Sequence, residues 1–178
     1  MICSPPGAAL GLIRIKSWTR TLRLSAVAGS AGRRERDDEM TDVVILYASG
    51  VTKNTEKVAR YIGKKVDADL FNLKAVSLID LSSYKTVVFG TGIHAGKPYK
   101  PVVSFIQDNK DQLAGKNVKL FICCMYNDEK GSGQCSRVSK ELGISDAVFF
   151  NKKEKSMNED GFPTSVDSFI GRLRCQLS

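Results

Sequence analysis

From residue 40 onward, short apolar segments alternate with longer segments whose apolar side chains recur at helical spacing. The segment 43–48 is continuously apolar and rich in β-branched residues, which is typical of a parallel strand buried on both faces. Four further segments have strand character, at 69–73, 86–90, 117–124 and 147–150. The amphipathic segments predict helices at 54–66, 101–113, 134–142 and 165–173.

This alternation predicts an α/β fold, a three-layer sandwich in which helices cover both faces of a five-stranded parallel sheet. With right-handed crossovers we expect the strand order 2-1-3-4-5. In this order the winding direction reverses between strands 1 and 3, and ligands bind beside such a reversal at the carboxyl ends of the strands. The loops 49–54, 91–99 and 125–133 should therefore build the site.

The first of these loops has the composition of a phosphate-binding loop. Free N–H groups and the helix dipole attract phosphate to a helix N-terminus. Gly50 permits an unusual turn, and donor side chains surround it, namely Ser49, Thr52, Asn54 and Thr55. Neither a Walker lysine motif nor GxGxxG is present in the loop, so a monophosphate fits best. An ordinary helix start, with Thr52 or Asn54 as the N-cap, is the alternative interpretation.

The stretch Thr52-Lys-Asn-Thr-Glu resembles the end of the flavodoxin phosphate loop, Ser/Thr-x-Thr-Gly-Asn-Thr. Lys53 stands where that family has glycine, and the loop is one residue longer when counted from Tyr47. The resemblance implies a flavodoxin-like fold with FMN as the cofactor. It also implies a phosphate site formed by Ser49, Gly50, Thr52, Lys53, Asn54 and Thr55.

The second loop has the spacing Gly-x-x-Ile-x-x-Gly from Gly90 to Gly96. This is similar to the flavodoxin-domain branch that contains the menaquinone-dependent protoporphyrinogen oxidases. The resemblance implies that this loop borders a flat flavin ring through Thr91, Gly92, Ile93, His94, Ala95 and Gly96. It also implies that Tyr126, just past the fourth strand, stacks on the ring. The sequence assigns no catalytic residue.

Composition sets residues 1–39 apart, because they are rich in Ala, Gly, Ser and Arg and contain no acidic residue before Glu35. We expect a disordered extension or a mis-assigned start ahead of Met40, with a transit peptide as the alternative. Residues 40–178, the expected FMN-binding domain, hold 20 Lys/Arg and 15 Asp/Glu, a net charge of +5. These basic residues are scattered without aromatic interleaving, so no nucleic-acid partner is expected.

The five cysteines form no CxxC pair and the chain has one histidine, so no metal-binding motif is present. An odd number of cysteines, two of them adjacent in a strand, is typical of free thiols in a reducing compartment, which predicts a cytoplasmic location. No apolar run approaches the roughly 20 residues that cross a bilayer, so no transmembrane segment is expected.

Together these observations predict an FMN flavoprotein that acts as an oxidoreductase or electron-transfer protein. Its partner would be a redox protein, a quinone or another small-molecule substrate, and a quinone- or protoporphyrinogen-oxidase-like enzyme is one form of this prediction. A receiver domain shares the strand order but needs acidic residues where Ala48-Ser49 and Gly90-Thr91 stand, which excludes it. Because Lys53 replaces glycine, a flavin-free binding module of the same fold is the alternative.

Overall fold

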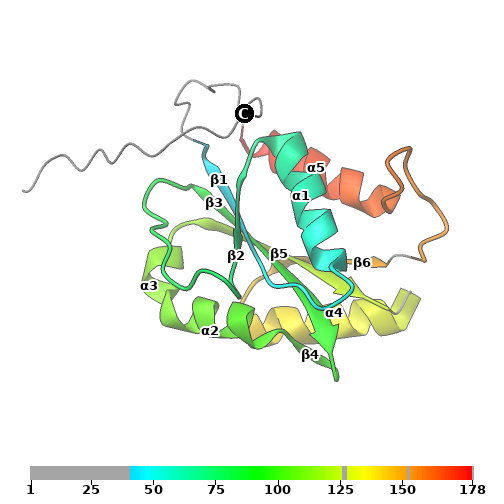
Figure 1. Cartoon of the computed structure of the whole chain (residues 1–178), viewed down its shortest axis with the longest axis horizontal. Helices are drawn as coiled ribbons and strands as arrows, with labels where there is room; N and C mark the ends of the chain where they lie inside the picture. Colours follow the sequence, from blue (N-terminus) through cyan, green and yellow to red (C-terminus); the bar gives the residue numbers. More distant parts are fainter. Residues whose placement is uncertain (1–40, 126–127, 152, 178) are drawn as a thin grey trace, which may run out of the picture. The chain divides into compact units, whose positions relative to one another are not determined.

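A five-stranded parallel sheet forms the centre of the domain in the computed structural model, which describes residues 41–125, 128–151 and 153–177 (Figure 1). The strand order is β2-β1-β3-β5-β6. This confirms the predicted order, because these five strands follow one another as 2-1-3-4-5. The strands are β1 (Val43–Tyr47), β2 (Asp69–Asn72), β3 (Thr86–His94), β5 (Asn117–Cys124) and β6 (Asp146–Asn151).

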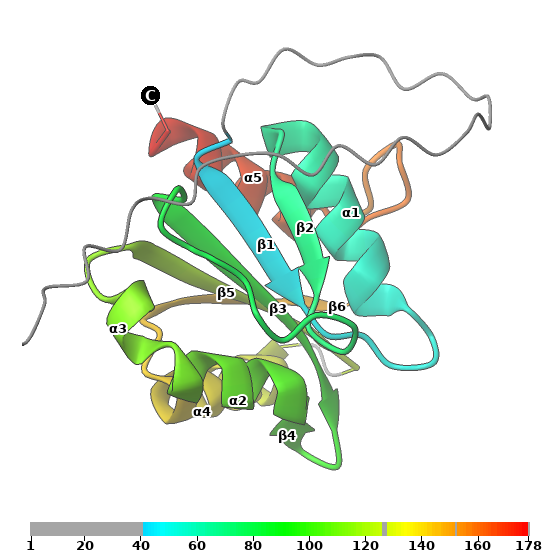
Figure 2. The same cartoon turned by 60° about the vertical axis from the view of Figure 1, so that its left-hand side comes forward.

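Helices cover both faces of the sheet, as expected for three layers (Figure 2). One face carries α1 (Asn54–Val66) and α5 (Thr164–Cys175). The other carries α2 (Lys100–Asp108), α3 (Lys110–Leu113) and α4 (Asp128–Leu142). Side chains alternate between faces along a strand, so Ile45 of β1 packs in the cluster with α1 and α5, whereas its neighbour Leu46 packs in the other cluster.

The third strand is longer than the sequence indicates, because β3 runs on through Thr91, Gly92 and Ile93 to His94. It then turns into β4 (Lys97–Pro98), which pairs antiparallel with it through His94 and Lys97. The turn residues Ala95 and Gly96 both have positive φ, 48° and 77°, as in a type I′ hairpin turn. The predicted loop 91–99 is therefore wrong, and a projecting hairpin takes its place.

Two predicted helix boundaries are also wrong. The helix predicted at 101–113 is divided at Asn109, whose φ of −119° is not helical and whose side-chain amide donates to the carbonyl of Phe105 (2.9 Å). Helix α4 begins at Asp128 rather than at 134. Its start contains Gly131 and Gly133, which lower helix propensity and hide the helix from sequence reasoning. Most of the predicted loop 125–133 is thus helical.

The predicted extension, residues 1–39, lies outside the described residues, so the expectations for it stay predictions. Within the described ranges, no helix combines the length and the apolar character that a membrane span requires.

Candidate functional site

The loop after β1 forms a tight turn that leads into helix α1. The N–H of Lys53 donates to the carbonyl of Gly50 (3.1 Å), and α1 begins at Asn54. Ser49 is buried, and its Oγ accepts from the N–H of Glu56 at 3.4 Å. The N–H groups of the first helical turn have no carbonyl four residues earlier within the helix, so this end of α1 attracts an anion.

Lys53 occupies the left-handed region, with φ 53° and ψ 21°, at the junction of turn and helix. Glycine adopts this conformation without steric cost, whereas a residue with a Cβ does so at roughly 1–2 kcal/mol. The backbone therefore keeps the shape for which flavodoxin loops use glycine. The substitution noted in the sequence is accommodated as local strain.

Tyr99 connects this turn to β3. Its N–H donates to Oγ1 of Thr91 (3.0 Å), and that fully buried hydroxyl donates to the carbonyl of Gly92 (3.0 Å). The Tyr99 ring lies against two glycines: a Cβ on Gly50 would be 2.2 Å from its hydroxyl oxygen, and one on Gly92 would be 2.6 Å from its ring. The absence of a side chain at Gly50 and Gly92 thus leaves space for the ring of Tyr99. These two glycines therefore accommodate a protein side chain and not the flavin ring.

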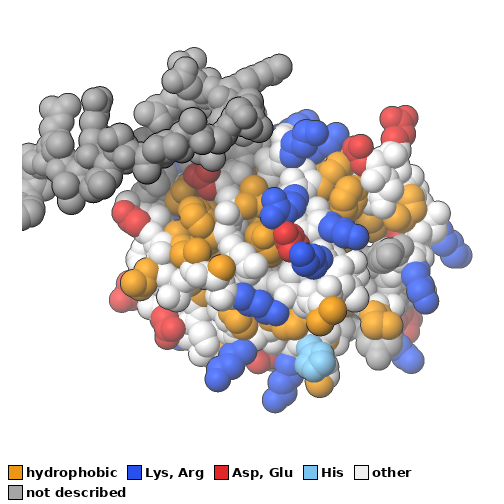
Figure 3. All heavy atoms as spheres, in the orientation of Figure 1, with side chains coloured by type: hydrophobic (Ala, Val, Ile, Leu, Met, Phe, Trp, Pro, Cys, Tyr) orange, Lys and Arg blue, Asp and Glu red, His pale blue; other side chains and the backbone are white. Residues whose placement is uncertain are grey.

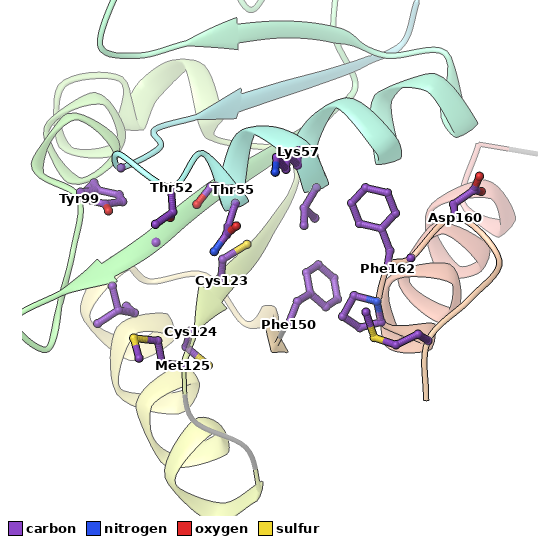
Figure 4. A pocket seen from close by; sticks show the side chains of 18 residues that line it. Thr52, Thr55, Lys57, Tyr99, Cys123, Cys124, Met125, Phe150, Asp160 and Phe162 are labelled. Atoms are coloured by element: carbon purple, nitrogen blue, oxygen red, sulfur yellow. The ribbon is translucent and has the colours of Figure 1, made fainter. Parts of the chain in front are cut away.

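A cavity of about 410 Å³ opens where α1 begins and β3 and β5 end. Its polar end is lined by Thr52, Asn54, Thr55 and Lys57 from the phosphate loop and α1. Figure 4 shows Thr52, Thr55 and Lys57 on one side of the cavity, and Phe150 and Phe162 on the other. Cavities of about 300–1,000 Å³ with a few convergent polar groups are typical ligand sites.

The wall opposite is the segment from Met157 to Pro163, which joins β6 to α5; Met157, Phe162 and Pro163 make it mainly apolar, and Asp160 adds one carboxylate to the lining. Asn158 fixes it: its Nδ2 donates to the hydroxyl of Tyr61 (2.9 Å) and to Oδ2 of Asp167 (2.7 Å), and its Oδ1 accepts from the N–H of Phe162 (2.8 Å). The Phe162 ring stacks on Tyr61, with ring centres 4.3 Å apart. The wall is therefore attached to both α1 and α5.

Two cysteines from the end of β5, Cys123 and Cys124, also line the cavity. Burial raises the pKa of the Cys123 thiol to about 12. Burial likewise raises the pKa of the nearby Cys135 thiol to about 11. The thiolate is the reactive form of cysteine, so at neutral pH Cys123 and Cys135 are protonated and serve as packing groups.

The structure gathers six of the predicted site residues around the cavity: Gly50, Thr52, Asn54, Thr55, Gly92 and Ile93. Ser49 and Thr91 are buried and hold the loops in place. Lys53, His94, Ala95 and Gly96 are exposed and do not line it. The predicted ring-stacking residue Tyr126 lies outside the described residues.

Sequence reasoning missed the wall that the C-terminal part contributes. Phe150 is the second-last residue of β6, and Phe162 lies between β6 and α5, directly after the charged stretch 152–161. A signal was present in the run Gly161-Phe-Pro163, because a glycine and an apolar pair stand directly before α5. Lys57 was missed because its position in the helical pattern places it on the solvated side of α1.

The chain belongs to the flavodoxin-domain family, whose sequence profile matches residues 44–176. Over 79 residues it is 38% identical to MJ0298, an uncharacterised protein of Methanocaldococcus jannaschii; the match covers 44% of this chain and half of that relative.

Solved structures with the same fold include three redox proteins. The flavodoxin of Streptococcus pneumoniae has a TM-score of 0.54 at 19% identity, covering 75% of this chain and 98% of that one. The flavodoxin of Fusobacterium nucleatum, bound to flavin mononucleotide, has a TM-score of 0.50 at 15% identity, covering 75% and 97%. The rubredoxin oxygen:oxidoreductase of Desulfovibrio gigas has a TM-score of 0.54 at 18% identity; the match covers 76% of this chain but only 37% of the larger protein.

Proposed function

We propose that this chain binds FMN at the cavity between α1, β3, β5 and the wall 157–163, and that it works as an oxidoreductase or electron-transfer protein. The observation that carries the proposal is the pairing of an anion-attracting helix start with a cavity that is polar at one end and apolar at the other. A phosphate on a planar aromatic ligand has this same division of character. The family and the FMN-bound relative support the choice of flavin.

The donor set fits the phosphate of FMN. The N–H groups of Asn54 and Thr55 at the start of α1, together with the side chains of Thr52, Asn54 and Thr55, offer neutral donors, and Lys57 adds a positive charge on the lining. The apolar lining from Ile93, Phe150 and Phe162 suits a flat ring and excludes water from it. When bound, FMN supplies reversible acceptance and release of electrons and hydride.

The second loop bears on the type of reaction that the bound flavin would carry out. The Gly-x-x-Ile-x-x-Gly stretch, which favours a protoporphyrinogen-oxidase-like or quinone-dependent enzyme, forms the end of β3 and the β3–β4 turn beside the cavity. In such an enzyme the flavin would exchange electrons with a quinone or another small molecule. The alternative is that it exchanges electrons with a redox partner protein.

Flavin titration of the purified full chain tests the proposal. We expect a yellow protein whose released ligand has the mass of FMN, and a flavin-free form that rebinds FMN more tightly than riboflavin or FAD. Thr52→Ala should weaken FMN by roughly ten- to a hundredfold, because one hydrogen bond to a charged group is lost, and should leave riboflavin affinity within about twofold. Ser168→Ala, on the exposed side of α5, is the matched control. Absence of FMN binding by every form would favour the flavin-free binding module.

A further inference from the structure

Exposed apolar side chains gather at the mouth of the cavity. The described part of the chain has six large hydrophobic residues that are exposed, and three of them are at this place. Met125 (87% exposed) and Met157 (41%) line the cavity, and Val51 (101%) stands at the tip of the phosphate loop between Gly50 and Thr52, which line it. Apolar side chains that are this exposed beside a site mark a surface that another molecule covers.

Basic side chains surround these apolar tips. Lys53 and Lys57 lie at the start of α1, and Lys97 and Lys100 lie on either side of Tyr99. Lys74 places its Nζ 5.0 Å from the centre of the Tyr99 ring, and Arg137 donates from Nη2 to the carbonyl of Gly96 (3.0 Å). Figure 3 shows Lys and Arg side chains on the molecular face that carries the single histidine, His94.

Acidic groups on the same elements are few and partly neutralised. Glu56 accepts from Arg60 (2.9 Å), and Asp160 pairs with Lys65 (3.4 Å). Glu129, exposed in the first turn of α4, and Glu159, exposed in the wall 157–163, oppose the basic groups. Basic groups still outnumber the acidic ones at the mouth, so its net charge is positive.

We propose that this face, with Val51 and Met125 at its centre and Lys53, Lys74, Lys97, Lys100 and Arg137 around them, docks an acidic protein that exchanges electrons with the bound flavin. The inference rests on the proposed function. Protein interfaces combine an apolar centre with a polar rim, and complementary charge steers the two proteins together.

Two acceptor proteins of opposite charge test the inference: cytochrome b5, which is acidic, and cytochrome c, which is basic. The FMN-loaded full chain is reduced with dithionite, excess reductant is removed, and each reduced chain passes one electron to each of two cytochrome molecules and releases the flavin's protons to solvent. We expect the second-order rate with cytochrome b5 to fall at least tenfold between about 10 mM and 150 mM ionic strength, as the Debye length shrinks from about 30 to 8 Å. The rate with cytochrome c should rise over the same range.

Charge-reversed variants locate the effect. Lys97→Glu with Lys100→Glu should lower the cytochrome b5 rate about tenfold at low salt, because rim charges act mainly on association. Lys64→Glu with Lys140→Glu changes the net charge equally in the last turns of α1 and α4, which run away from the cavity mouth, and should change the rate less than twofold. Both double variants should keep the FMN affinity of the parent.

A readout without electron transfer separates this inference from the proposed function. Titration of the labelled, flavin-free chain with cytochrome b5 should shift the NMR signals of Val51, Lys97 and Met125, and Val51→Ser should weaken the complex severalfold. Equal rates for the two double variants, or shifts confined to other faces, would overturn the docking surface even if FMN binds. Failure of FMN binding together with the expected shifts would overturn only the proposed function.

Discussion

Lys53 keeps a glycine-like backbone at the start of α1, and this has a measurable cost in stability. We expect Lys53→Gly to raise the free energy of unfolding by about 0.5–1 kcal/mol, because relief of the left-handed strain exceeds the extra entropy of glycine in the unfolded chain. Urea denaturation measures the change. Lys64→Gly, at a helical position of the same helix, should lower stability by up to about 1 kcal/mol. Equal losses for both variants would show that residue 53 is unstrained.

Thr91 and Ser49 show the limit of residue-level interpretation. Their hydroxyl groups suggest ligand contact when read in sequence, yet both are buried and bond to the backbone of the site loops. A hydroxyl group near a binding site either bonds to the surrounding backbone or points into the cavity. The direction of the side chain decides between the two, and the spacing of residues along the sequence does not reveal that direction.

Among the elements, the β3–β4 hairpin depends on a turn whose first residue is unfavourable. Ala95 has φ 48° at a position where type I′ turns prefer asparagine, aspartate or glycine. Ala95→Asn should therefore stabilise the domain by about 0.5–1 kcal/mol. Thermal denaturation measures the change in stability. Alanine to asparagine at Ala114, where φ is −59°, should give no increase in stability. A gain at both positions would assign the effect to asparagine itself and not to the turn.

The side chain of Asn158 makes three of the hydrogen bonds that hold the wall from Met157 to Pro163. Asn158→Ala removes the hydrogen bonds to Tyr61, Asp167 and Phe162, and we expect a loss of about 1–3 kcal/mol together with faster hydrogen exchange across the wall. Glu159→Ala, an exposed neighbour, is the control. If Asn158→Ala leaves exchange of the wall unchanged, the segment is held by its backbone hydrogen bonds and apolar packing instead.

The strands and their order followed from the sequence because buried parallel strands carry a strong apolar signal, as in 43–48. The hairpin and the start of α4 did not, because Ala95-Gly96 lacks a typical type I′ pair and Gly131 and Gly133 weaken the helical pattern. The polar lining of the cavity could be predicted because Thr52, Asn54 and Thr55 lie close together in the sequence. Phe150 and Phe162 were not, because they reach the cavity only through long-range packing.

For the whole molecule, two tyrosines link stability to alkaline pH. Burial and the neighbouring carboxylates, Asp167 for Tyr61 and Asp69 for Tyr84, raise the pKa of each phenol to about 12. An unfolded tyrosine ionises near pH 10, so between pH 10 and 12 the unfolded state loses its protons first. Stability should be complete below pH 10 and fall as the pH rises through 12. Urea titrations at a series of pH values measure the free energy of unfolding. In Tyr61→Phe and in Tyr84→Phe this free energy should decrease less steeply with pH than in the parent. An unchanged pH dependence in both variants would contradict the link between these tyrosines and stability.

The two ends of the cavity are formed by segments that lie far apart in the sequence. The order of synthesis therefore decides when the cavity can form. The polar end is complete once α1 has left the ribosome, whereas the apolar wall is about a hundred residues further along the chain. Domains fold during synthesis from the N-terminus, so a nascent chain exposes the phosphate loop well before residues 157–163 close the cavity against α1. Capture of a ligand should therefore wait until residues 157–163 have been synthesised, and a ligand present at that moment would act as a template that favours docking of α5.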